Sequence, residues 1–313
     1  MSQTYKIQIK GQFQGVGFRP FVYNLAKKID LKGSVFNNED GVIIYCESTE
    51  EKAENFLNQI LNNHPDIAVI TSHNMVKTSG LGFDNFSIVP SEKSTQLNLP
   101  LTPDFAICNS CKKEIHSTEN RRYSYAFTTC VNCGPRYAIT RNYPFERANT
   151  SLMAFKMCDV CVDEYTNPSD RRFHSQTNSC KSCGVKLKLV SNSTEIISTD
   201  QKHSISQAVD FIKNGNILAI KNTSGYLLCS DASNPQAIEN LRKRKQRPQK
   251  PFAVMYPDFE AVQNDFNCSD SEKEALQSGV APIVILKNSK KTSIAVEAIA
   301  PNLQQTGVML PSS

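Results

Sequence analysis

The chain has 313 residues, of which 39% are apolar and 21% are charged. This length predicts two or three domains, and this balance excludes a chain that is disordered throughout. No run of about 18 apolar residues predicts a membrane span, and the first residues, MSQTYK, lack the apolar core of a secretion signal. A cytoplasmic protein without membrane contact is therefore expected. The net charge is +5, with the basic excess in residues 91–190, which fits an anionic partner.

Residues 5–89 alternate between strand-like and helix-like patterns. Apolar residues at every second position predict strands, and apolar residues four apart predict helices. In chain order these patterns predict a strand over 5–10, a helix through Phe21, Leu25 and Ile29, strands over 35–37 and 42–46 around an Asp40-Gly41 hairpin turn, a helix over 56–61, and strands over 67–70 and 86–89. The order β-α-β-β-α-β is that of the ferredoxin-like, or split-βαβ, fold.

A glycine-rich segment, GQFQGVGFR, joins the first strand to the first helix and ends at Arg19. A turn of this kind at a helix N-terminus presents backbone N–H groups that bind phosphate oxygens. Arg19 falls in the first helical turn, where its planar guanidinium suits two phosphate oxygens. The alternative is a glycine turn with a structural role alone. The predicted phosphate-binding residues are Gln14, Gly15, Val16, Gly17 and Phe18.

The longer pattern favours a catalytic role. The segment from Gly11 to Arg19, followed by Gly33-x-Val35-x-Asn37 and Asp40-Gly41-Val42, resembles the acylphosphatase family over about residues 5–90. The resemblance implies that Arg19 binds the substrate phosphate and that Asn37 orients the attacking water. An acyl phosphate is already activated, so positioning the water and stabilising charge suffice, without a metal or a nucleophilic side chain. Residues 1–90 are thus expected to form an acylphosphatase-like domain.

Eight of the eleven cysteines form four Cys-x-x-Cys pairs in a middle segment, residues 100–190. Within each half of this segment 18 residues separate the two pairs, and the halves are offset by 50 residues. Phe105/Phe155, Glu114/Glu164 and Gly134/Gly184 obey the same offset, which indicates an internal duplication. The paired cysteines are Cys108/Cys111, Cys130/Cys133, Cys158/Cys161 and Cys180/Cys183.

This spacing is a zinc signature, because two thiolates on one tight turn and two on another complete a tetrahedral site. We expect two structural zinc ions. The absence of a secretion signal disfavours disulfides, and two metal sites account for four pairs in register better than redox pairs do. Each copy could close on itself or exchange pairs with the other; duplication favours self-contained units. His174 lies between the pairs of the second copy where the first has Ser124, and is expected to be a surface or substrate-contact residue rather than a ligand.

Residues 200–313 return to α/β patterning after polar linkers at 90–95 and 191–194. A helix is predicted over 205–212 and a buried strand over 217–220. A basic run, LRKRKQRPQKP, follows; alone, it reads as a solvated helix face. Its Lys-x-Arg-Pro and Lys-Pro elements resemble the nucleotide-binding motif of the YrdC/Sua5 domain. The resemblance implies nucleotide binding by Lys221, Lys245, Arg247 and Lys250.

The three segments in this order resemble one family, the HypF-type carbamoyltransferases of nickel–iron hydrogenase maturation. The expected fold class is α+β multidomain: a ferredoxin-like acylphosphatase domain, a zinc-finger module and an α/β YrdC-like domain. The resemblance implies hydrolysis of carbamoyl phosphate, activation of the carbamate with ATP as carbamoyl-adenylate, and delivery to the C-terminal cysteine of a HypE-type partner protein. The alternative is a zinc-containing RNA- or protein-binding module related to the tRNA-modifying YrdC/Sua5 factors, with weak RNA binding.

Two departures from the family pattern bear on the third domain. The segment after Lys221 lacks two glycines and a histidine that the family has there. The chain also stops at Ser313, shortly after a motif that resembles an interior family motif. The YrdC-like domain is therefore expected to be truncated, with the chain a fragment, a split gene product or a degenerate paralogue.

Overall fold

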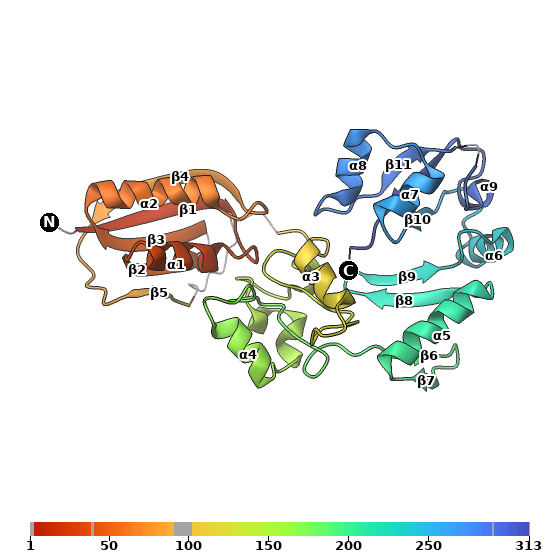
Figure 1. Cartoon of the computed structure of the whole chain (residues 1–313), viewed down its shortest axis with the longest axis horizontal. Helices are drawn as coiled ribbons and strands as arrows, with labels where there is room; N and C mark the ends of the chain where they lie inside the picture. Colours follow the sequence, from red (N-terminus) through yellow and green to blue (C-terminus); the bar gives the residue numbers. More distant parts are fainter. Residues whose placement is uncertain (1–2, 39–40, 91–101, 290, 313) are drawn as a thin grey trace. The chain divides into compact units, whose positions relative to one another are not determined.

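A computed structural model describes residues 3–38, 41–90, 102–289 and 291–312 (Figure 1). Its contacts divide the chain into two compact units, Met1–Asp104 with Thr128–Gly184 and Phe105–Phe127 with Val185–Ser313. Glu39 and Asp40 of the predicted hairpin turn, and residues 91–95 of the predicted linker, lie outside the described residues. Within the described ranges, no helix combines the length and apolar character needed to cross a membrane.

The first unit is built on a five-stranded sheet of order β4-β1-β3-β2-β5, on which two helices lie side by side (Figure 1). The elements are β1 (Gln3–Gln12), α1 (Phe18–Lys28), β2 (Lys32–Asn38), β3 (Gly41–Ser48), α2 (Glu50–Asn63), β4 (Val69–Thr78) and β5 (Phe86–Ile88). Val22 of α1 and Phe56 of α2 are fully buried in the core. The Thr49 hydroxyl caps α2 by accepting from the Lys52 N–H at 3.4 Å. The predicted β-α-β-β-α-β order is confirmed, with β5 added parallel to β2.

One predicted strand was misplaced. The sequence pattern predicted a strand over 67–70, whereas β4 begins at Val69 and continues to Thr78. This strand lies at the edge of the sheet, and most of its side chains are exposed. An edge strand with a mostly solvated surface carries little apolar alternation, so periodicity cannot mark its extent.

The duplicated cysteine segment has little regular structure beyond short helices. These are α3 (Asn109–His116), α4 (Asp159–Thr166) and the 3₁₀ helices η1 (Tyr137–Ile139), η2 (Arg147–Asn149) and η3 (Ser151–Ala154). α3 and α4 are offset by 50 residues, as the duplication predicts. Ser124 and His174 also correspond, because both adopt a left-handed conformation, with φ of 53° and 56°. The two copies therefore share backbone geometry as well as sequence.

The second unit contains a three-stranded sheet of order β10-β12-β11 and two hairpins. Besides α3, its elements are β6 (Leu189–Val190), β7 (Ile196–Ser198), α5 (Gln201–Lys213), β8 (Leu218–Asn222), β9 (Gly225–Cys229), α6 (Pro235–Lys245), β10 (Ala253–Met255), α7 (Phe259–Asp265), α8 (Asp270–Gln277), β11 (Val284–Lys287), α9 (Val296–Ile299) and β12 (Gln305–Met309). Leu286 and Val308 are fully buried at the centre of its core. The predicted helix over 205–212 and strand over 217–220 correspond to α5 and β8. The strand is not buried as predicted, because among the described strands β8 pairs only with β9 in a two-stranded hairpin and most of its side chains, Ile220 included, are exposed. Mixed α and β elements confirm the expected fold class.

Candidate active site and zinc sites

The glycine-rich segment forms a tight turn between β1 and α1. Phe13, Val16 and Phe18 are buried and anchor it to the core. Gly15 and Gly17 have φ of 76° and 74°, a left-handed conformation that glycine adopts without steric cost. Gly17 is the N-cap of α1 and contributes no side-chain cap. The first N–H groups of α1 thus face the turn, as the predicted phosphate loop requires.

A small cavity of about 20 Å³ lies against this turn. Gly15, Gly17, Phe18 and Arg19 line one side of it. The other side comes from the cysteine segment: Val131, Arg136, Phe145, His174, Ser175 and Gln176. All of these residues belong to the first compact unit. The cavity is therefore built by the acylphosphatase-like fold and the cysteine segment together.

Arg19 lies at the edge of this cavity with an acidic neighbour. Its Nη1 is 3.5 Å from Oε1 of Glu146, and the two side chains are 11% and 34% exposed. Burial lowers the pKa of the Arg19 guanidinium, while the carboxylate of Glu146 opposes that shift. An arginine stays protonated through such a shift, so the cavity carries a fixed positive charge beside the glycine turn.

Arg136 joins the turn to the first copy of the cysteine repeat. Its Nε donates to the carbonyl of Gly15, its Nη2 donates to the carbonyls of Cys130 (3.1 Å) and Val131 (2.9 Å), and its Nη1 donates to those of Cys133 and Pro135 (both 3.0 Å). The residue is only 2% exposed, and burial lowers its pKa to about 10, still well above neutral. One guanidinium thus ties a cysteine turn to the phosphate loop.

Gln14 provides a second tie between the loop and the cysteine segment. Its side-chain oxygen accepts from the N–H of Phe145 at 2.7 Å, and its carbonyl accepts from the Thr102 hydroxyl at 2.8 Å. Gln14 therefore bonds the loop to the cysteine segment and is not among the described residues that line the cavity. Asn37 lies on β2 and is 3% exposed, and it is not among the described residues that line the cavity.

Sequence reasoning missed Arg136 and Glu146 as neighbours of the loop. Arg136 is 121 residues from Gly15, and no local pattern links positions so far apart. His174 was noticed, and the signal that marks it is its departure from Ser124 within an otherwise matching repeat. In the structure, His174 lines the cavity.

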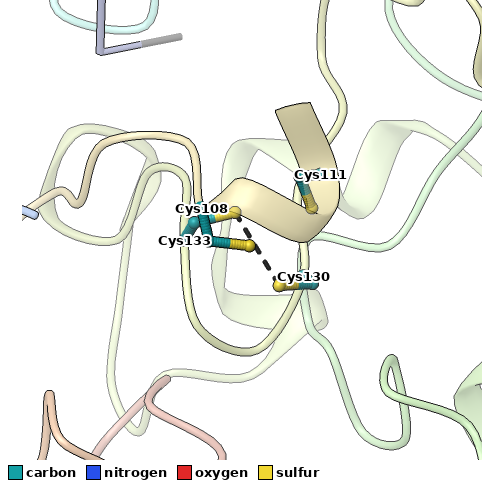
Figure 2. Close-up of side chains that lie close together, drawn as sticks. All are labelled: Cys108, Cys111, Cys130 and Cys133. Atoms are coloured by element: carbon teal, nitrogen blue, oxygen red, sulfur yellow. Dashed lines mark hydrogen bonds between the residues drawn. The ribbon is translucent and has the colours of Figure 1, made fainter. Parts of the chain in front are cut away.

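The eight paired cysteines form two clusters of four. Cys108, Cys111, Cys130 and Cys133 form one, shown in Figure 2, and Cys158, Cys161, Cys180 and Cys183 form the other. Within each cluster all the sulfur atoms lie within 4.8 Å of one another. The self-contained wiring that duplication favours is confirmed. Cys108 and Cys158 are the N-caps of α3 and α4, so each cluster includes the residue at which a short helix begins.

The cluster geometry fits zinc. A tetrahedral ion with bonds of about 2.3 Å sets sulfur atoms about 3.8 Å apart. The Sγ–Sγ distances are 3.7 Å for Cys130/Cys133, 3.8 Å for Cys180/Cys183 and 3.6 Å for Cys161/Cys183, far longer than a disulfide bond. Burial opposes ionisation of Cys180, but the N–H groups of Ser182 and Cys183 and the neighbouring thiols lower its pKa to about 6. Two closed four-thiolate sites are suited to structural zinc.

The predicted nucleotide-binding residues lie in the second unit. Lys245 ends α6 and Lys250 follows it, both exposed, while Arg247 donates to the carbonyls of Lys250 (3.1 Å) and Pro251. The buried Arg242 holds this segment by donating to the Lys250 carbonyl at 3.0 Å. Lys221 lies apart in sequence, on β8, with its ammonium over the ring of Tyr226. The basic run is therefore an ordered segment rather than a uniformly solvated helix face.

Comparisons with known proteins agree with this architecture. Residues 5–88 match the acylphosphatase family, residues 107–140 and 157–190 match the HypF finger, and residues 210–313 match the Sua5/YciO/YrdC family, described as telomere recombination. An acylphosphatase of Thermotoga petrophila is 39% identical over 87 residues, which are 28% of this chain and 96% of that protein. The fold and site thus define a multidomain protein that joins an acylphosphatase domain, a duplicated zinc finger and a YrdC-like domain.

Relatives that match the chain over its whole length identify a narrower family within this class of protein. The carbamoyltransferase HypF of Synechocystis is 43% identical over 310 residues, covering 99% of this chain and 40% of that protein. The crystal structure of a full-length HypF in the phosphate- and nucleotide-bound form superposes with a TM-score of 0.93 at 38% identity, covering 100% of this chain and 40% of that one. The chain belongs to the HypF family. It spans about 40% of the length of these relatives.

Proposed function

We propose that this chain carries out the first steps of a HypF-type carbamoyltransferase. Its acylphosphatase-like domain, residues 1–90, hydrolyses carbamoyl phosphate to carbamate and inorganic phosphate. Its YrdC-like domain, residues 200–313, joins carbamate to ATP as carbamoyl-adenylate and releases pyrophosphate. The duplicated zinc module, residues 100–190, lies between them in sequence. The observation that carries the proposal is the glycine turn that opens, together with Arg19, onto a small cavity.

The hydrolytic step needs charge stabilisation and a positioned water. Arg19 and the N–H groups that begin α1 bind the phosphoryl oxygens, whose negative charge changes in the transition state. Asn37 orients the water that attacks, as the acylphosphatase resemblance implies. Gln14, Gly15, Val16, Gly17 and Phe18 form the loop that holds the phosphate. Because carbamoyl phosphate is a mixed anhydride and already activated, the domain positions the substrate and the attacking water and needs no covalent enzyme intermediate.

Phosphate release from carbamoyl phosphate by the full chain tests this step. Arg19→Ala should lower kcat/KM about 10²-fold or more, because it removes the cationic partner of the transferred group. Arg141→Ala, an exposed arginine, serves as the control and should leave the rate unchanged. Near wild-type turnover by the Arg19 variant would exclude this site as the hydrolytic centre.

The later steps concern ATP and a protein partner. Lys221, Lys245, Arg247 and Lys250 are proposed to bind the ATP phosphates, with the carbamoyl group destined for the C-terminal cysteine of a HypE-type partner. A cytoplasmic location fits this role. The alternative, an RNA- or protein-binding zinc module, is less well supported, because a pure binding module has no need for a phosphate loop beside a cavity. Salt-sensitive binding of tRNA without phosphate release from carbamoyl phosphate would favour it.

A further inference from the structure

The second zinc repeat differs from the first at one position that faces the phosphate loop. Ser124 and His174 occupy equivalent places, 50 residues apart, and their N–H groups donate to equivalent carbonyls, Ile115 at 2.8 Å and Tyr165 at 2.9 Å. Both residues are left-handed, a conformation that is uncommon for serine and that histidine, asparagine and aspartate adopt more often than other non-glycine residues. The backbone of the repeat is therefore kept while the side chain has changed from a hydroxymethyl group to an imidazole.

That imidazole is fixed and lines the cavity. Its ring lies 4.6 Å from the Phe173 ring and 5.1 Å from the Tyr165 ring, measured between centroids. It shares the cavity wall with Gly15, Gly17 and Arg19. The phosphate side of the cavity, made of loop N–H groups and a guanidinium, offers hydrogen-bond donors. The histidine lies on the zinc-repeat side, where it would meet the other end of a bound acyl phosphate.

The ring is neutral under ordinary conditions. Burial, together with the positive charge of Arg19, lowers the pKa of His174 to about 4, although the carboxylate of Glu146 opposes the shift. A neutral imidazole carries one N–H donor and one acceptor nitrogen. A carbamoyl group presents the complementary pair, an NH₂ donor and a carbonyl acceptor, whereas an acetyl group presents the carbonyl alone. An acceptor nitrogen would therefore distinguish the two.

We propose that His174 binds the carbamoyl end of the substrate and makes the acyl-phosphate cavity selective for carbamoyl phosphate over acetyl phosphate. The inference rests on the proposed hydrolytic function and deepens it. It gives the second zinc repeat a direct role in substrate recognition, through a side chain that the first repeat lacks. Glu146 and Arg136 keep separate roles, as neighbours of Arg19 and of the loop backbone.

The test compares kcat/KM for carbamoyl phosphate and acetyl phosphate in the full chain. His174→Ser restores the residue of the first repeat, whose backbone already tolerates serine in this conformation. It should lower the carbamoyl-to-acetyl preference about tenfold, chiefly through KM, as expected for one hydrogen bond to the substrate. His174→Asn keeps a donor and an acceptor and suits a left-handed residue, so it should recover much of the preference. Inhibition by inorganic phosphate should stay within about twofold of wild type, because Arg19 and the loop are unchanged.

His73→Ser, an exposed histidine of β4 in the same unit, is the matched control and should change neither rate. Zinc content should be equal in all variants. An active wild type whose preference is unchanged by His174→Ser, or a variant that loses both activities in the same proportion, would overturn this inference alone. A wild-type chain inert toward both substrates would overturn the proposed hydrolysis and the inference with it.

Discussion

At the scale of single residues, Arg136 makes hydrogen bonds that the sequence around it does not predict. Its guanidinium donates to five backbone carbonyls, four in the segment 130–135 and one in the phosphate loop. Carbonyls that lose such a partner while buried are costly, since water cannot reach them. The residue is thus both a structural centre of the first repeat and a support for Gly15.

Arg136→Ala should therefore destabilise the unit and loosen the loop. We expect a loss of about 3 kcal/mol or more, because several buried carbonyls become unpaired and a large side chain leaves a void. In a unit of this size that loss lowers Tm by roughly 6–12 °C. The measurement is thermal unfolding, accompanied by KM for carbamoyl phosphate, which should rise. Arg141→Ala, exposed, is the control; equal melting of the two variants would show that the Arg136 bonds contribute little.

At the scale of elements, the zinc turns and the phosphate loop form one mechanical unit. The Cys130–Cys133 turn offers its carbonyls to Arg136 only while its backbone keeps the shape that the cluster imposes. The segment has few regular elements of its own, so metal–thiolate bonds replace much of an apolar core. Zinc in the first cluster is therefore expected to support hydrolysis without touching substrate.

Removing that zinc should lower acylphosphatase activity. The purified chain should hold two zinc ions, and Cys133→Ser should reduce the content toward one and raise KM for carbamoyl phosphate. Elemental analysis and phosphate release measure the two effects. Cys229→Ser, a half-buried cysteine outside both clusters, should keep two ions and full activity. Unchanged kinetics in a Cys133 variant that has lost an ion would separate the zinc turn from the loop.

The elements also show which parts of the fold could be predicted from the periodicity and spacing of residues in the sequence. β1, α1 and α2 were predictable because each buries one face, and the cysteine clusters because four ligands recur at fixed intervals. The extent of β4 was not, since an edge strand is mostly solvated. Glu146 and Arg136 could not be tied to the loop either, because that contact depends on how distant segments pack. His174 was visible only as a mismatch within the repeat, and the sequence left open what it faces.

At the scale of the whole molecule, the two proposed reaction sites lie in different compact units. Arg19 and its cavity belong to the first, and the basic segment after α6 belongs to the second. Variants that remove ATP contacts should therefore leave phosphate release from carbamoyl phosphate intact. Within the basic segment, Arg242 has a structural role, because it is 4% exposed and hydrogen-bonded to backbone carbonyls. Lys245 and Lys250 are exposed and available to a ligand.

ATP binding should accordingly be electrostatic and depend on the two lysines. Exposed ammonium groups attract the triphosphate, but salt screens them, so the affinity should fall by about tenfold or more between roughly 50 mM and 500 mM salt. The double variant Lys245→Gln, Lys250→Gln should lose about tenfold at low salt and most of the salt dependence, as two exposed contacts of about 1 kcal/mol or less would give. Calorimetric titration with ATP measures both.

Lys213→Gln with Lys273→Gln, elsewhere in the unit, is the matched control for net charge, and all three proteins should hydrolyse carbamoyl phosphate equally. ATP affinity that survives the double variant would place the nucleotide away from this segment, whereas parallel loss of hydrolysis would show that the two units do not act independently.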